Sequence, residues 1–106
     1  MTDKNLGRLG LAKRAGRVAA GFDPALTAVK DGTARLVLLA SDLSEKTLKE
    51  WRFSAERYGI PTRALPHSKA DIGMALGAHR EVGIVAVCDD GFAKAIERDC
   101  PQQEEE

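Results

Sequence analysis

The chain has 106 residues, enough for one hydrophobic core but too few for two separate domains. Its 16 basic side chains balance 16 acidic ones, so the formal net charge is zero. The charges are unevenly distributed, because residues 1–35 carry seven Lys or Arg against three Asp, whereas residues 36–106 carry nine against thirteen. A local basic face is compatible with this segregation, and so is chance in a small protein.

Cysteine and histidine usage argues against a disulfide framework and against zinc. The two cysteines, Cys88 and Cys100, form no Cys-x-x-Cys pair, and Cys88 lies in an apolar run where we expect it to be buried. No Cys/His cluster has metal-ligand spacing, so we expect no zinc or other metal site. The chain shows no signal-peptide pattern, and its longest apolar run is well short of the ~20 residues that span a bilayer. We therefore expect a cytoplasmic protein with no membrane partner.

Helices and strands are predicted to alternate in the first half of the chain. A helix is expected over residues 4–15 and a short strand over residues 17–20. Asp23 is expected to cap a second helix that runs to about Lys30. The apolar run at residues 36–40 then predicts a strand that is covered on both faces.

The second half continues the alternation. Ser44 is expected to cap a third helix, followed by a strand over residues 62–65. Ser68 caps a short fourth helix with Asp71 as its capping-box partner, and a strand follows at residues 84–88. Asp89 and Asp90 can then cap a last helix with Phe92 and Ile96 facing inward. The apolar side chains expected on one stripe of the third helix are Leu48, Trp51, Ala55 and Tyr58.

This alternation favours an α/β fold, a three-layer α/β/α sandwich around a small, largely buried sheet. We find no internal repeat and no interior linker. Residues 1–100 are therefore expected to form a single domain, and residues 101–106 a disordered acidic tail.

No constellation of residues indicates catalysis. The two imidazoles, His67 and His79, lie twelve residues apart, and their spacing suggests no nucleophile or carboxylate partner. Helix capping explains the Asp89-Asp90 pair more simply than acid–base chemistry does. The glycines Gly7 and Gly10 match no dinucleotide or phosphate-loop motif, and close backbone packing explains them. We expect no enzymatic activity.

Two loops favour nucleic-acid binding. The turn at residues 20–23 leads into a helix N-terminus, where backbone N–H groups attract phosphate. The loop at residues 78–83 combines a cation, a carboxylate and an aliphatic side chain that we expect to be exposed, a mixture suited to an unstacked nucleotide. Taken alone, each loop is more simply explained as an ordinary solvated connection, and in the second loop Arg80 and Glu81 can pair on the surface. The predicted RNA-contacting residues are Lys13, Arg14, Arg17, Gly21, Phe22, Asp23, Thr27, Arg80, Glu81 and Val82.

The chain resembles a known family over nearly all of residues 5–97. It looks like the bacterial YlxQ-type proteins of the L-seven-Ae superfamily of kink-turn-binding ribosomal proteins. The resemblance implies a mixed four-stranded sheet in the three-layer sandwich and binding of structured RNA without a cofactor. It depends on the order and spacing of five blocks, at residues 9–16, 21–32, 35–42, 68–77 and 90–96.

The resemblance also implies where RNA would be contacted. Kink-turn readers carry an Asn-Glu pair at the start of the second helix and a Lys three residues later, and the matching positions here are Asp23, Pro24 and Thr27. Asp23 would repel phosphate more than Asn, and Pro24 lacks a backbone donor. The family's loop that covers a flipped-out base corresponds to residues 79–83, with Val82 as the apolar contact. The fold therefore carries over, whereas kink-turn specificity does not follow.

Two hypotheses from different classes result. The first is a non-enzymatic RNA-binding protein associated with the ribosome or translation, with structured RNA, including ribosomal RNA, and ribosome or translation proteins as partners. The second is a protein-interaction adaptor that keeps the fold while its RNA surface has decayed. The losses at Pro24 and Thr27 motivate the second.

Overall fold

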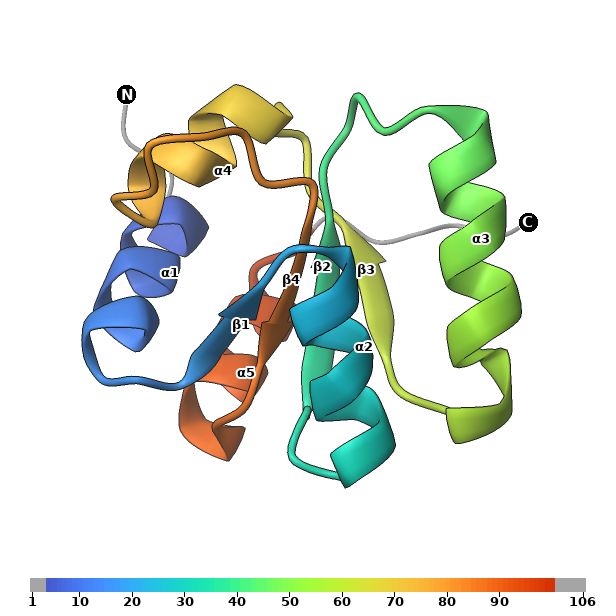
Figure 1. Cartoon of the computed structure of the whole chain (residues 1–106). Helices are drawn as coiled ribbons and strands as arrows, with labels where there is room; N and C mark the ends of the chain where they lie inside the picture. The colour runs from blue at the N-terminus through green and yellow to red at the C-terminus, as the bar shows by residue number, and fades with distance from the viewer. Residues whose placement is uncertain (1–3, 101–106) are drawn as a thin grey trace.

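Helices and strands alternate along residues 4–100, the part of the chain that the computed structural model describes (Figure 1). The predicted tail at residues 101–106 lies outside the described residues. The elements are α1 (Lys4–Arg14), β1 (Val18–Ala20), α2 (Phe22–Asp31), β2 (Leu36–Leu39), α3 (Glu45–Ala55), a 3-10 turn η1 (Glu56–Tyr58), β3 (Thr62–Ala64), α4 (Lys69–Ala75), β4 (Ile84–Val87) and α5 (Asp90–Arg98).

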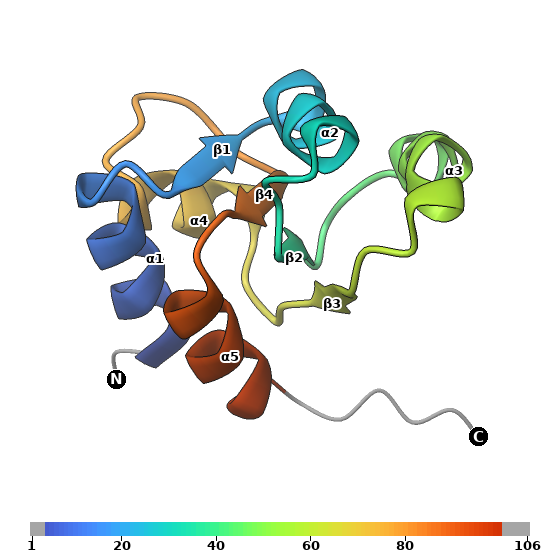
Figure 2. The same cartoon turned by 90° about the horizontal axis from the view of Figure 1, so that it is seen from below.

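The four strands form one mixed sheet in the order β1-β4-β2-β3. The central strands β4 and β2 are antiparallel, and so are β1 and β4, whereas β2 and β3 run parallel. Helices cover both faces: Figure 2 shows α2 and α3 on one side and α1, α4 and α5 on the other. The predicted α/β sandwich with a mixed four-stranded sheet is confirmed.

Successive side chains of a strand point to opposite faces of the sheet, so the core consists of two halves, the first beneath α1, α4 and α5 and the second beneath α2 and α3. Leu36 and Leu38 point toward α1, α4 and α5, while Val37 and Leu39 point toward α2 and α3. All four are at most slightly exposed, as expected of a strand between two helical layers. Trp51 on α3 is the largest buried side chain of the second half, and its ring meets Phe22 edge to face at a centroid distance of 5.4 Å.

Helix capping follows the sequence in three of four predicted cases. The side chains of Ser44, Ser68 and Asp89 each accept a backbone N–H from the third residue of the following helix. Asp23 was expected to do the same for α2, and that prediction is wrong. The helix begins two residues earlier, at Phe22, with Gly21 as a cap that offers no side chain.

Three smaller predictions also need correction. Tyr58 leaves the α3 stripe, because the helix ends at Ala55 and the tighter 3-10 turn rotates the tyrosine into solvent. Cys88 lies just past the end of β4 and is only half-buried. Close packing applies to Gly10, where an added Cβ would lie 3.0 Å from the Ala75 carbonyl oxygen, but not to Gly7, which has open space.

Candidate nucleic-acid interface

The start of α2 is shaped by Gly21. The residue has a φ of 108°, a conformation that favours glycine, and its N–H donates to the Ile84 carbonyl at 2.7 Å. Its own carbonyl accepts the first helical hydrogen bond, from Ala25 N–H. Because Pro24 has no N–H, only Phe22 and Asp23 contribute backbone donors at this end of the helix. The helix start thus offers two donors rather than four.

The three positions that match the kink-turn motif share one exposed surface. Asp23, Pro24 and Thr27 are all exposed in the first two turns of α2, and Asp23 and Thr27 are four residues apart, on the same helix face. These three positions present one carboxylate, one hydroxyl and no cation. Their charge is therefore negative where a phosphate-binding surface would be positive.

The loop at residues 78–83 is held against α4 by its backbone. Gly73 lets the chain approach so closely that an added Cβ would lie 2.2 Å from the Arg80 carbonyl oxygen. Val82 N–H donates to the Lys69 carbonyl at 3.1 Å, closing the loop onto the first turn of α4. This anchoring leaves the side chains of Arg80 and Glu81 exposed.

Val82 was predicted to be an exposed aliphatic that covers a base, and its exposure is wrongly predicted. The side chain is 1% exposed and belongs to the core cluster beneath α4. Its N–H bond to Lys69 turns the valine inward, so Val82 offers no surface to a ligand in this conformation. Any apolar contact at this site must come from another residue.

A cavity of about 220 Å³ joins the start of α2 to this loop. Phe22 supplies an aromatic wall, Leu43 an aliphatic one, and Lys69 a cation. We call it the Phe22 cavity, and its lining residues are Phe22, Leu43, Ser44, Thr47, Lys69, Gly83 and Ile84. These residues come from four separate stretches of the chain. Only Phe22 among them was predicted as a site residue.

Lys69 interacts with two acidic residues near the cavity. Its backbone N–H donates to Asp42 Oδ1 at 2.9 Å, and its side-chain Nζ lies 3.9 Å from Glu81 Oε1. The predicted alternative of an Arg80–Glu81 surface pair is therefore not what the structure has, since Glu81 faces Lys69. Lys69 was missed as a site residue, although it lies inside one of the blocks that carry the family resemblance.

The three basic residues predicted to hold phosphates lie elsewhere. Lys13 and Arg14 end α1, and Arg17 precedes β1, all of them exposed. In Figure 1 this region is at the lower left, whereas Phe22 follows the other end of β1. Arg14 instead borders a groove of about 420 Å³ between α1 and α4, beside Gly10 and Met74. The structure thus separates these cations from the Phe22 cavity by the length of β1.

Among residues 4–100, no helix has the length and apolar character needed to cross a membrane. Within the same residues, no three His, Cys, Asp or Glu side chains gather as a metal site.

The chain is similar in sequence to ribosomal proteins and to RNA-binding proteins. The sequence model of the ribosomal protein L7Ae/L30e/S12e/Gadd45 family matches residues 3–97. The RNA-binding protein YlxQ of Bacillus subtilis is 36% identical over 88 residues, which cover 83% of this chain and 86% of that protein. The large ribosomal subunit protein eL30 of Aeropyrum pernix is 28% identical over 85 residues, covering 80% of this chain and 85% of that protein.

Solved structures agree on the fold. A Bacillus halodurans protein of unknown function superposes with a TM-score of 0.83 at 32% identity, covering 92% of this chain and 96% of that one. The Giardia lamblia 15.5kD RNA binding protein superposes with a TM-score of 0.72 at 18% identity, covering 92% of this chain and 86% of that one. The second likeness concerns the fold alone.

Proposed function

Because the chain belongs to the ribosomal protein L7Ae/L30e/S12e/Gadd45 family, we propose that it binds structured RNA and has no enzymatic activity. We further propose that it works in the cytoplasm in association with the ribosome or translation, with ribosomal RNA among its targets. Relatives named as an RNA-binding protein and as a ribosomal protein, each matched over most of its length, support this proposal.

The Phe22 cavity is the observation that carries the proposal. It places an aromatic ring, an aliphatic side chain and a lysine around a space open to solvent, next to a helix start with two backbone donors. A base removed from its stack needs an apolar surface for its face and a cation for its phosphate. We propose that Phe22 and Leu43 contact the base, and that Lys69 and Arg80 contact phosphate. Gly21 immediately precedes the two backbone N–H donors of the helix start.

The remaining predicted residues take supporting roles in this proposal. Asp23 and Thr27 border the RNA from the exposed face of α2, and Glu81 sets the position of Lys69. Lys13, Arg14 and Arg17 provide sequence-independent attraction for RNA that extends along β1. Val82 acts only by holding the loop in place.

A salt-titrated binding assay tests the proposal, with a kink-turn RNA and a matched RNA whose G·A pairs are replaced by Watson–Crick pairs. Preference for the kinked RNA would mean that Asp23, Pro24 and Thr27 still support the family's recognition mode. Equal, salt-dependent binding would indicate an RNA target of another kind. Absence of binding to both RNAs at low salt would overturn the proposal in favour of the protein-interaction adaptor.

A further inference from the structure

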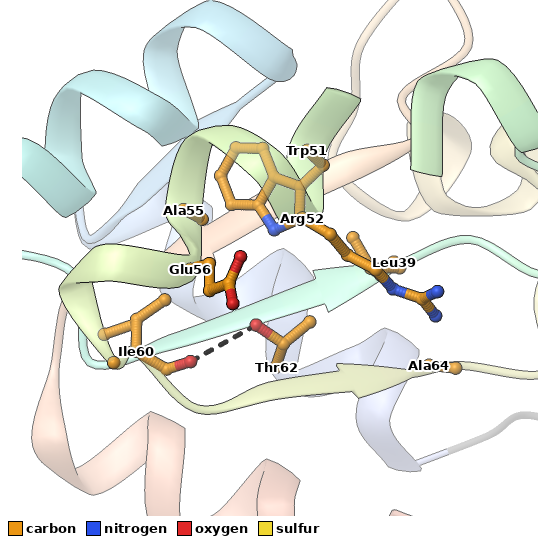
Figure 3. Close-up of a pocket in the computed structure, with 9 residues that line it drawn as sticks. Leu39, Trp51, Arg52, Ala55, Glu56, Ile60, Thr62 and Ala64 are labelled. Atoms are coloured by element: carbon orange, nitrogen blue, oxygen red, sulfur yellow. Dashed lines mark hydrogen bonds between the residues drawn. The ribbon is translucent and has the colours of Figure 1, made fainter. Parts of the chain in front are cut away.

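A second cavity, of about 480 Å³, lies between α3 and β3 (Figure 3). Its floor is made by Leu39 of β2 with Thr62 and Ala64 of β3, and α3 forms the opposite wall. The wall residues are Trp51, Arg52, Ala55 and Glu56. None of the residues that line this α3–β3 groove lines the Phe22 cavity, so the two sites are distinct.

An unsatisfied donor points into the α3–β3 groove. Trp51 is 1% exposed, and its Nε1 is buried without a hydrogen-bond partner. Figure 3 shows this nitrogen directed toward the strands, on the side of the ring that faces Glu56 and Thr62. A buried N–H that makes no hydrogen bond raises the free energy of the folded state. A ligand that brings an acceptor beneath Trp51 recovers that free energy.

The strand that forms the floor has an open edge. β3 is the last strand of the sheet and pairs only with β2. The Pro61 carbonyl and the Leu65 N–H both bond to β2, so residues 62 and 64 direct their backbone groups away from it. The Thr62 carbonyl accepts from Arg63 Nη1 at 3.0 Å. The N–H groups of residues 62 and 64 and the Ala64 carbonyl therefore face the open edge.

α3 flanks the open edge of β3 from one face of the sheet, the face that α2 also covers. In both Figure 1 and Figure 2 this helix lies beyond β3, farther from the sheet centre than the edge strand itself. Arg52 of α3 and Glu56 of η1 both line the groove, and Figure 3 shows their charged groups pointing apart.

We propose that the α3–β3 groove binds an extended segment of a partner protein, which pairs with β3 as a fifth strand. One small apolar side chain of the segment fills the space beneath Trp51, and an oxygen acceptor of the segment receives the Trp51 N–H. Arg52 and Glu56, being oppositely charged, fix the direction of the segment by facing an acidic and a basic residue. RNA suits this groove poorly, because Glu56 repels phosphate and the open edge offers backbone groups at the spacing of a polypeptide.

Substitution of Ala64 tests the pairing directly. Ala64→Pro removes the outward N–H and leaves the hydrogen bonds between β2 and β3 intact. Ala64→Ser is the matched control, because it keeps the N–H and adds one exposed hydroxyl. Trp51→Phe keeps an aromatic ring and removes the buried donor.

The probe is a phage-displayed library of random nine-residue peptides, followed by a synthetic peptide of the selected sequence. We expect Ala64→Pro to weaken binding of that peptide about fivefold or more, Trp51→Phe about threefold to fivefold, and Ala64→Ser by less than about twofold. In amide NMR spectra the peptide should shift the signals of Thr62 and Ala64 and the indole N–H of Trp51. RNA affinity of the Ala64→Pro protein should equal that of the wild type, which also reports that the variant is folded.

Several outcomes would overturn the proposal. One is that the library yields no peptide that is enriched on this protein relative to an unrelated protein. Another is that the selected peptide shifts NMR signals around the Phe22 cavity instead of the groove. Unchanged affinity in both Ala64→Pro and Trp51→Phe would exclude strand pairing at β3. A concentration-dependent dimer that Ala64→Pro abolishes would mean that a second copy of this chain occupies the groove. If the protein binds no RNA but still binds the peptide as expected, the proposed function is refuted, whereas the proposal of a peptide-binding groove is supported.

Discussion

Gly73 is the residue that fixes the loop at the edge of the candidate RNA interface. A Cβ at this position would lie 2.2 Å from the Arg80 carbonyl oxygen and 3.4 Å from the Glu81 Cα, both of them backbone atoms. Gly73→Ala must therefore displace the loop or α4, at a cost of about 1–3 kcal/mol in the free energy of unfolding. We expect weaker RNA binding as well, and urea unfolding and RNA titration measure the two effects.

Gly7 provides the matched control for this substitution. It lies in α1, where an added Cβ meets no atom within 4 Å. Since alanine favours a helix interior over glycine, Gly7→Ala should raise the free energy of unfolding by about 0.5–1 kcal/mol and leave RNA affinity unchanged. A Gly73→Ala protein as stable as the wild type would contradict the close approach of the loop.

Lys69 is the cation nearest the base-binding space that we propose. Lys69→Met removes the charge but keeps the backbone bonds of this residue to Asp42 and Val82, so we expect little change in stability. Its RNA affinity should fall, and the dependence of log K on log salt should lose about one phosphate contact. Lys30→Met, at the far end of α2, is the control with the same loss of charge. Equal effects of the two substitutions would remove Lys69 from the interface.

At the scale of the residue, the sequence could identify a single site residue better than the residues that surround it in the fold. Phe22 was predicted to contact RNA and lines the cavity, because it adjoins a recognisable helix start. Leu43 and Lys69 were missed, since only folding brings them beside Phe22. Val82 is buried in the core cluster and its N–H bonds to Lys69, thirteen residues earlier, and no local pattern predicts these contacts.

Among the elements, α1 and α5 are joined by an ion pair that titrates in acid. Arg8 Nη1 donates to Asp99 Oδ2 at 2.5 Å, and this hydrogen bond lowers the pKa of Asp99 below its ordinary value. A lowered pKa in the folded state adds stability above the unfolded-state pKa, and this stability is lost as the pH falls through the folded-state pKa. The free energy of unfolding should therefore decline below about pH 4.

Two variants isolate the contribution of this pair. Asp99→Asn should remove the contribution of residue 99 to the acid-dependent decline, because no group titrates there. Arg8→Ala should remove most of it, because the Arg8 hydrogen bond is the largest cause of the lowered Asp99 pKa, with smaller contributions from Arg98 and Lys4. Chemical unfolding at several pH values from 7 to 2.5 measures the effect. Variants that keep the full acid dependence of the wild type would show that the pair makes no pH-dependent contribution.

Most element boundaries could be predicted because local chemistry determines them. Ser44, Ser68 and Asp89 cap helices through their own side chains, which a sequence displays directly. The start of α2 was misplaced by two residues because Gly21 is held by Ile84, a partner 63 residues away. The 3-10 turn after α3 was not predicted, since residues 56–58 continue a helical pattern until the chain must reach β3.

At the scale of the molecule, the order of the strands could not be obtained from the sequence pattern. Four apolar runs of similar character give no reason to place β4 between β1 and β2. The family resemblance supplied the mixed four-stranded sheet, and the structure confirms it. Neither the sequence pattern nor the resemblance predicted how charge is distributed over the folded molecule. Basic residues that are close in the chain suggested a single site, whereas in the structure β1 separates them from the Phe22 cavity.

Since the net charge is zero, we expect RNA affinity to depend on local groups of cations, and its salt dependence should report how many of the proposed cations an RNA reaches. A long RNA that contacts Lys69 and Arg80 at one end of β1 and Lys13, Arg14 and Arg17 at the other makes five phosphate contacts. Its log–log salt slope should be about −3.5 to −4.5, whereas an RNA too short to pass β1 should give about −1.4 to −1.8. Arg14→Ala should flatten the first slope by about one contact and leave the second unchanged. Identical slopes for the two RNAs would mean that the cations beyond β1 do not take part, and that binding is confined to the Phe22 cavity.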